Sequence, residues 1–214
     1  MEAVDQARLD AWLARLGGPG YKGRDDQKQA VAEMRAAGPD VLFPFLTPML
    51  TADEESRCQA CEAILQISAE RGLELVLPLL RDPDLRVRWF VCECVAGFGG
   101  SRAVPALVTV LKSDEDAQVR GTAARGLGWQ GGPEVIPPLL ETMASDHKID
   151  MHGHSPSHCA SMALDDILGT DETCLHLGNI CRMLDRKPDL DRLRRLAEDR
   201  YQQWLEGNEP QHGR

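Results

Sequence analysis

Residues 87–105 read VRWFVCECVAGFGGSRAVP, and residues 119–137 read VRGTAARGLGWQGGPEVIP. Matching residues in the two stretches lie 32 positions apart, as Arg88 and Arg120 do, and as Pro105 and Pro137 do. A fixed period of roughly 20–50 residues indicates a solenoid, in which each unit buries its apolar face against its neighbours. The duplication therefore predicts a protein built from helical repeats.

Outward from this duplication, the apolar periodicity and the breakers predict paired helices over residues 39–170. Asp53 is the expected N-cap of one of them, Pro44 and Pro48 interrupt another, and Arg71-Gly72 is read as a turn. The predicted helices span residues 40–50, 54–68, 73–80, 85–97, 103–111, 117–128, 135–144 and 157–168.

The whole of 1–207 is expected to form a single domain. Residues 1–38 supply N-terminal cap helices (5–16 and 27–37), and residues 171–207 supply C-terminal cap helices (173–184 and 189–205). A repeat stack needs such caps because its end units have no neighbour to cover them. The polar residues 208–214 are expected to be a disordered tail.

Composition narrows the class of partner. The net charge of −10 argues against nucleic acid, whose binding depends on Lys and Arg, and favours a basic protein partner. Aromatic residues make up only 5% of the chain, which suits many small helix contacts. There is no apolar run of the roughly 18 residues that a membrane span needs. The absence of a secretion signal and the seven cysteines, an odd number, predict a cytoplasmic protein with reduced thiols.

Each unit carries a Pro in its first helix, an Asp in the turn and an Arg six residues later. Asp82 with Arg88, and Asp114 with Arg120, are the two sets. With the "VR..AA.ALG.LG" pattern around Arg120, they make the chain resemble HEAT-repeat proteins, especially the short HEAT-like repeats of phycobilisome lyases. The resemblance implies an all-α, right-handed α-solenoid of about four to five helical hairpins with terminal capping helices. It also implies that these Asp and Arg residues form a structural ladder between repeats.

The cysteine pairs are interpreted as core residues. Cys58-x-x-Cys61 and Cys92-x-Cys94 fall inside predicted helices, whereas zinc pairs usually stand on turns. Cys61, Cys92 and Ala124 share one register, four residues after the Arg, where small side chains let helices approach closely.

The segment 146–158 is the main departure from the repeat. It contains four of the six histidines, and His152, His154 and His158 are candidate metal ligands. No second pair of ligands stands at a fixed zinc spacing, so neither a metal nor another cofactor is predicted. Two other interpretations remain: a polar insertion that caps the next helix, with Ser155 or Ser157 as N-cap, and a loop that contacts a partner.

Other candidate partner-binding residues follow from the resemblance, which implies that the second helix of each hairpin lines the concave face. Large aromatic residues there are either binding anchors or fillers between repeats. The predicted partner-binding residues are Trp89, Phe90, Glu93, Arg125, Trp129, His152 and His154.

No catalytic motif is present, and no catalytic residue is predicted. The HEAT-like hydroxylases use His-Glu dipeptides, and no histidine here is followed by Glu. We therefore expect a non-enzymatic scaffold that binds a protein through its concave face and the 146–158 loop. The alternatives are a bacterial immunity protein or antitoxin that neutralises a toxin domain, and a metal-dependent or lyase-like protein that uses His152, His154 and His158. The oligomeric state stays open.

Overall fold

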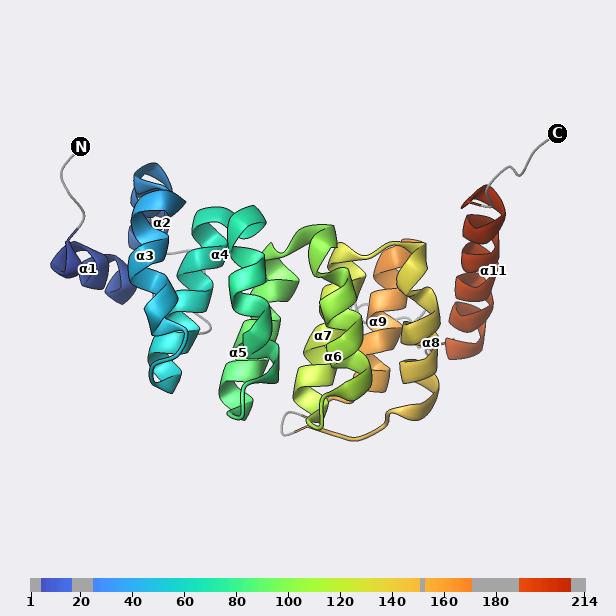
Figure 1. Cartoon of the computed structure of the whole chain (residues 1–214). Coiled ribbons are helices and arrows are strands. Elements are labelled where there is room, and N and C mark those ends of the chain that lie inside the picture. The colour runs from blue at the N-terminus through green and yellow to red at the C-terminus, as the bar shows by residue number, and fades with distance from the viewer. Residues whose placement is uncertain (1–4, 17–24, 151–152, 171–188, 209–214) are drawn as a thin grey trace. The chain divides into compact units, whose positions relative to one another are not determined.

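A computed structural model describes residues 5–16, 25–150, 153–170 and 189–208 (Figure 1). Over these ranges the regular structure is helical and contains no strand, which confirms the predicted all-α class. The chain divides into two compact units, Met1–Ala103 and Val104–Arg214. The cap helix predicted at 173–184, the residue His152 and the tail beyond Asn208 lie outside the described residues.

The first unit is a run of helical hairpins in which neighbouring helices pack together. Buried apolar residues recur at helical spacing, as Leu42 and Leu46 do. The apolar side of each hairpin packs against the neighbouring hairpin. The elements are α1 (Gln6–Leu16), α2 (Asp25–Ala37), α3 (Pro39–Met49), α4 (Glu54–Val76), the 3-10 turn η1 (Leu77–Arg81), α5 (Leu85–Phe98) and η2 (Gly100–Ala103).

In the first unit, helices continue through two sites at which the sequence predicted an interruption or a turn. Pro44 and Pro48 lie inside α3, which remains one helix because Leu42 and Leu46 on its other face are fully buried. The predicted turn at Arg71-Gly72 is wrong: the chain leaves helical geometry at Ser68 (φ −157°, ψ 97°) and is helical again through Gly72. Gly72 is there for packing, because a Cβ at that position would lie 3.1 Å from the carbonyl oxygen of Ile64.

The second unit has two layers. Helices α6 (Val104–Ser113) and α8 (Ile136–Ser145) pack side by side, and each forms a hairpin with a helix of the other layer, α7 (Ala117–Gln130) or α9 (Pro156–Leu168). The 3-10 turn η3 (Pro133–Val135) leads into α8, and α11 (Leu190–Asn208) packs on α8 and α9 through the buried Leu193 and Ala197. The capping role expected of residues 189–205 stays a prediction.

Side-chain caps fix where the second helix of each hairpin begins. Asp53, Asp84 and Asp116 accept hydrogen bonds from backbone N–H groups at the starts of α4, α5 and α7. Ser155 does the same for α9 by accepting from the His158 N–H, with Pro156 in the first turn. The predicted cap Asp53 is thus confirmed, and Ser155 is the cap of α9 rather than its alternative Ser157. Such caps contribute about 1 kcal/mol each.

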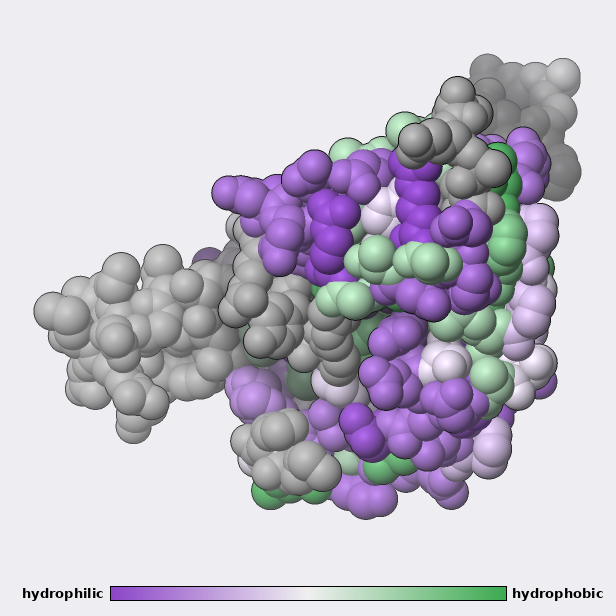
Figure 2. Space-filling model, turned by 90° about the vertical axis from the view of Figure 1, so that its left-hand side faces the viewer, coloured by the Kyte–Doolittle hydropathy of each residue, from purple (hydrophilic) through white to green (hydrophobic). Residues whose placement is uncertain are grey.

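Surface and core are separated as a water-exposed helical protein requires. The coloured residues on the face shown in Figure 2 are mainly hydrophilic, and the hydrophobic ones form small, separate groups. Cys61, Cys92 and Ala124, the small residues that share one register, are all fully buried. Among the described helices, none combines the length and the apolar character of a membrane span.

Candidate functional site

An arginine early in the second helix of a hairpin can contact two turns, the one before its own helix and the next one along the chain. The guanidinium of Arg57 donates to the carbonyl oxygen of Ala52 in the turn before its own helix (2.6 Å). It also forms an ion pair with Asp82 in the next turn, with 2.9 Å between Nε and Oδ2. Arg88 donates to the carbonyl oxygen of Asp82 (3.0 Å), so Asp82 and Arg88 meet through the backbone while the Asp82 carboxylate binds Arg57.

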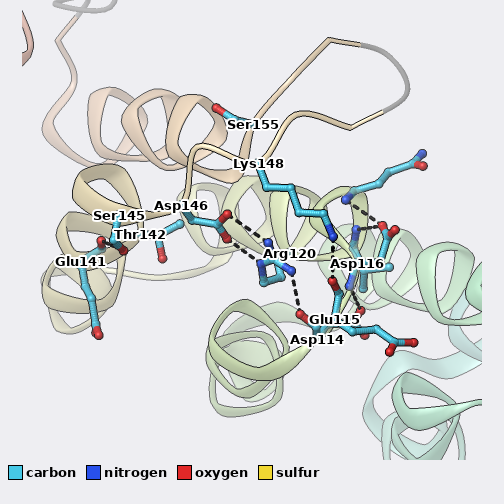
Figure 3. Close-up of polar contacts among 12 residues, drawn as sticks. Asp114, Glu115, Asp116, Arg120, Glu141, Thr142, Ser145, Asp146, Lys148 and Ser155 are labelled. Carbon is cyan, nitrogen blue, oxygen red and sulfur yellow. Dashed lines mark hydrogen bonds and ion pairs between the residues drawn. The ribbon is translucent and has the colours of Figure 1, made fainter.

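Arg120 repeats this arrangement in the second unit, with Asp114 and Asp146 as its partners (Figure 3). It donates to the carbonyl oxygen of Asp114 (2.8 Å) and binds the Asp146 carboxylate through two nitrogens, at 2.5 and 3.0 Å. This fork on a carboxylate is the strong geometry for an arginine. The hydrogen bonds from Arg120 hold the pKa of Asp146 below its usual value.

Asp146 also joins the two ends of the 146–158 loop, of which it is the first residue. Its carbonyl oxygen accepts from the Ser157 N–H (2.8 Å), and the Ser157 hydroxyl donates to the carbonyl oxygen of Met143 (2.7 Å). Lys148 donates to the carbonyl oxygen of Glu115 in the preceding turn (3.4 Å), as Figure 3 shows. These contacts hold the described residues at the two ends of the loop close together.

The far side of the loop is also closed by hydrogen bonds. Asp150 and His154 exchange backbone contacts: the Asp150 N–H donates to the carbonyl oxygen of His154 (2.7 Å), and the His154 N–H donates to the Asp150 carboxylate (2.9 Å). Gly153 has a φ of 82°, which glycine adopts without strain. Ile149 projects from the loop with 68% of its surface exposed. The loop thus displays a large apolar side chain on a constrained backbone.

Two of the three candidate histidine ligands, His154 and His158, lie together in the 146–158 loop. The rings of His154 and His158 are parallel, with 6.0 Å between their centroids. Burial, and secondarily His154, lowers the pKa of His158. Within the described residues no group of three or more His, Cys, Asp or Glu side chains could hold a metal ion. His152 is outside those residues, so the metal alternative stays a prediction.

Trp129 lies at the other end of α7 from the loop. Gly121 and Gly128 of α7 face Cys159 and Ala163 of α9, so these two helices run parallel. The loop joins the start of α9, whereas Trp129 stands near the end of α7. Its side chain is 54% exposed, and Arg125 on the same helix is half-buried. The predicted residues Trp129 and His154 are therefore at opposite ends of one helical layer.

The predicted residues of the first unit lie on α5. Phe90 is only 6% exposed, so it takes the core role that the sequence left as its alternative, and it is not a surface anchor here. Trp89 and Glu93 are half-buried. They lie four residues apart on one face of the helix, where part of each side chain reaches the surface.

The described cysteines behave as core groups. Burial raises the pKa of the Cys58 thiol to about 12, and a hydrogen bond with Cys61, together with burial, raises that of Cys94. Cys159 is also buried, and burial raises its pKa. Protonated thiols of this kind pack as small apolar side chains.

Sequence reasoning missed Asp146, Lys148 and Ile149. Asp146 could have been found, because Asp82, Asp114 and Asp146 follow one another at the 32-residue period. Lys148 and Ile149 carry no such signal, since they stand in the insertion, outside the repeat pattern.

Paired helices in layers, with an Asp–Arg contact from one turn to the next, define a helical-repeat protein. The family profile for HEAT repeats matches residues 40–117 and 73–151, which together cover more than half of the chain. The chain therefore belongs to the HEAT-repeat family, as its motif suggested.

Comparisons beyond the family add little. No curated protein matches the chain. Among solved structures, the crystal structure of an engineered protein, a target of the Northeast Structural Genomics Consortium, is similar over 98% of this chain and 100% of its own. Its identity with this chain is 19% and the TM-score is 0.47.

Proposed function

We propose that this HEAT-repeat scaffold binds a protein partner, and that the 146–158 loop is a principal contact. One observation carries the proposal: the loop is closed at Asp146 and still exposes 68% of Ile149. An apolar side chain that remains this exposed contributes little to the stability of the fold. The same side chain supplies binding energy when a partner covers it.

Each unit carries one further candidate contact residue on a second helix. Trp129 on α7 and Trp89 on α5 are large aromatic side chains that remain partly or largely exposed. Tryptophan is enriched among residues that dominate binding energy. Because Trp129 and the loop lie at opposite ends of α7, a partner that touches both would follow the length of that helix.

Replacement of Ile149 tests the proposal. We expect Ile149→Ser to weaken partner binding by more than tenfold, because a buried anchor residue typically contributes about 2 kcal/mol or more. Folding stability should change by less than about 0.5 kcal/mol, since the side chain is largely exposed. Leu205→Ser is the matched control, because Leu205 is also an exposed apolar residue (37%) but lies on α11.

The measurement is a pull-down with the wild-type protein and both variants, compared by quantitative mass spectrometry. Support is a protein that the wild type and Leu205→Ser retain equally and that Ile149→Ser loses. Equal retention by all three proteins would show that the loop is not a principal contact.

The charge of the chain favours a basic partner. With a net charge of −10, the scaffold attracts positively charged surfaces over distances longer than direct contacts. The narrower form of the proposal, an immunity protein that neutralises a basic toxin domain, depends on this same property. Its test is whether the protein captured through Ile149 is basic and toxic to cells that lack the scaffold.

A further inference from the structure

The ion pairs of Arg57 and Arg120 differ in the segment to which the aspartate belongs. Arg57 binds Asp82, which belongs to a short turn between η1 and α5. Arg120 binds Asp146, which belongs to the 146–158 loop. The chemistry of the two ion pairs is the same, but only the second one fixes a long insertion.

Three contacts at the loop base involve Asp146 itself. The N–H of Asp146 donates to the carbonyl oxygen of Thr142 (3.0 Å), its carbonyl oxygen accepts from Ser157, and its carboxylate receives the Arg120 fork. The Asp146 side chain is 20% exposed and that of Arg120 is 12% exposed. Water therefore competes weakly for this pair, and a charged hydrogen bond in such a setting is stronger than one on the open surface.

We infer that Arg120 is a positioning residue for the loop: by binding Asp146 it holds the loop base closed against the turn at 114–116 and so sets the direction in which Ile149 points. The inference rests on the proposed function only for the statement that the loop contacts a partner. The closing of the loop by Arg120 is a property of the free protein and is tested without any partner.

Local hydrogen exchange is the direct measurement. In Arg120→Gln we expect the backbone amides of Gly153, His154 and Ser157 to exchange at least about tenfold faster than in the wild type, because loss of charged hydrogen bonds frees the loop base. Amides inside α7 should change little. Arg57→Gln is the matched control, which removes the equivalent ion pair and should leave the loop amides unchanged.

Limited trypsin digestion provides a second readout. Lys148 is a cleavage site within the loop, and its ammonium is tied to the turn at Glu115. Cleavage after Lys148 should be faster in Arg120→Gln and in Asp146→Asn, and no faster in Arg57→Gln. Arg120→Lys keeps the charge but not the fork, so it should restore part of the protection.

A double-variant cycle separates a specific pair from general loosening. Arg120→Gln combined with Asp146→Asn should expose the loop no more than either single variant does, because both remove the same contact. Additive effects of the two changes, unchanged exchange in Arg120→Gln, or equal exposure of the loop in Arg57→Gln would each overturn the inference. If Arg120→Gln does not fold, the Asp146→Asn variant carries the same comparison.

The two proposals can fail independently. If Arg120→Gln opens the loop but Ile149→Ser still binds the partner, then the positioning role stands and the contact role of the loop is wrong. If the loop stays closed without Arg120 but Ile149→Ser loses the partner, then the reverse holds.

Discussion

At the scale of single residues, His158 makes the start of α9 sensitive to acid. Its ring is half-buried, lies parallel to that of His154 and stands near the N-terminus of a helix. Burial, the neighbouring imidazole and the positive end of the helix all disfavour the charged form. The lowered pKa of His158 in the folded state expresses this preference.

The sign of the pH effect follows from that lowered pKa. Below the ordinary histidine value of about 6.5, the unfolded chain binds a proton at His158 more readily than the folded chain does, so stability is complete above this pH and falls below it. We expect the melting temperature to drop between about pH 7.5 and about pH 5.5. His158→Gln should flatten this dependence, and His147→Gln, which changes an exposed histidine, should leave it in place. Identical pH profiles for the wild type and His158→Gln would contradict the prediction.

The sequence predicted individual residues well where the period governs them. Asp82, Asp114 and Arg120 were placed in turns and helices by the 32-residue repeat, and the buried small residues by their shared register. The period says nothing about the partner of a side chain. For that reason the sequence predicted a ladder between repeats without its individual pairs, one of which is the Asp82 carboxylate with Arg57 from the preceding hairpin.

At the scale of elements, the close approach of α7 and α9 rests on glycine and other small residues. A Cβ at Gly128 would lie 2.8 Å from the Cα of Ala163, a backbone atom that cannot rotate away. By contrast, Gly97 on α5 is exposed and has nothing within 4 Å of such a Cβ. The two glycines occupy similar places near the ends of their helices, yet they face different surroundings.

This difference predicts opposite effects of one substitution. Gly128→Ala should lower the free energy of unfolding by about 1–3 kcal/mol, because α9 must shift to admit the methyl group. Gly97→Ala should raise it by up to about 1 kcal/mol, because alanine favours the helix and meets no obstacle. Chemical denaturation of the two variants beside the wild type measures both. Destabilisation of similar size in the two variants would show that the spacing of α7 and α9 is not set by Gly128.

Helix boundaries were predictable where capping residues mark them, and less so elsewhere. Asp53 marks the start of α4 and Ser155 the start of α9, because a side-chain acceptor at that position is a local signal. The predicted helix 54–68 ends at Ser68, where the chain does leave helical geometry, but the sequence did not predict that the helix resumes directly after it. Gly72 was misread because a glycine required by a neighbouring side chain looks the same in sequence as one required by a turn.

At the scale of the whole molecule, the net charge follows directly from the amino-acid composition. The net charge of −10 predicts that association with a basic partner is accelerated by long-range attraction. The affinity for the partner captured through Ile149 should therefore fall as salt is raised from about 50 mM to about 500 mM, mainly through a slower association rate. Surface plasmon resonance at several salt concentrations measures this, and a salt-independent association rate would contradict it.

The fold class and the family could be predicted from the sequence because the same pattern of residues recurs in several units. The exposure of single aromatic residues was not within reach of the sequence: Trp89 and Phe90 are neighbours in one helix, yet Trp89 is half-buried and Phe90 is buried. Burial depends on which neighbours surround a helix face, and the repeat pattern does not encode that for residues that depart from it.

The meeting of Asp146 and Ser157 has one more consequence. The chain leaves the helical stack at Asp146 and returns to it at a hydrogen-bonded neighbour 2.8 Å away. A longer or shorter segment between Asp146 and Ser155 keeps the cap of α9, and doubling its length would add only about 0.6 kcal/mol of closure entropy. Foreign peptides grafted between Asp146 and Ser155 would therefore be presented by the same scaffold.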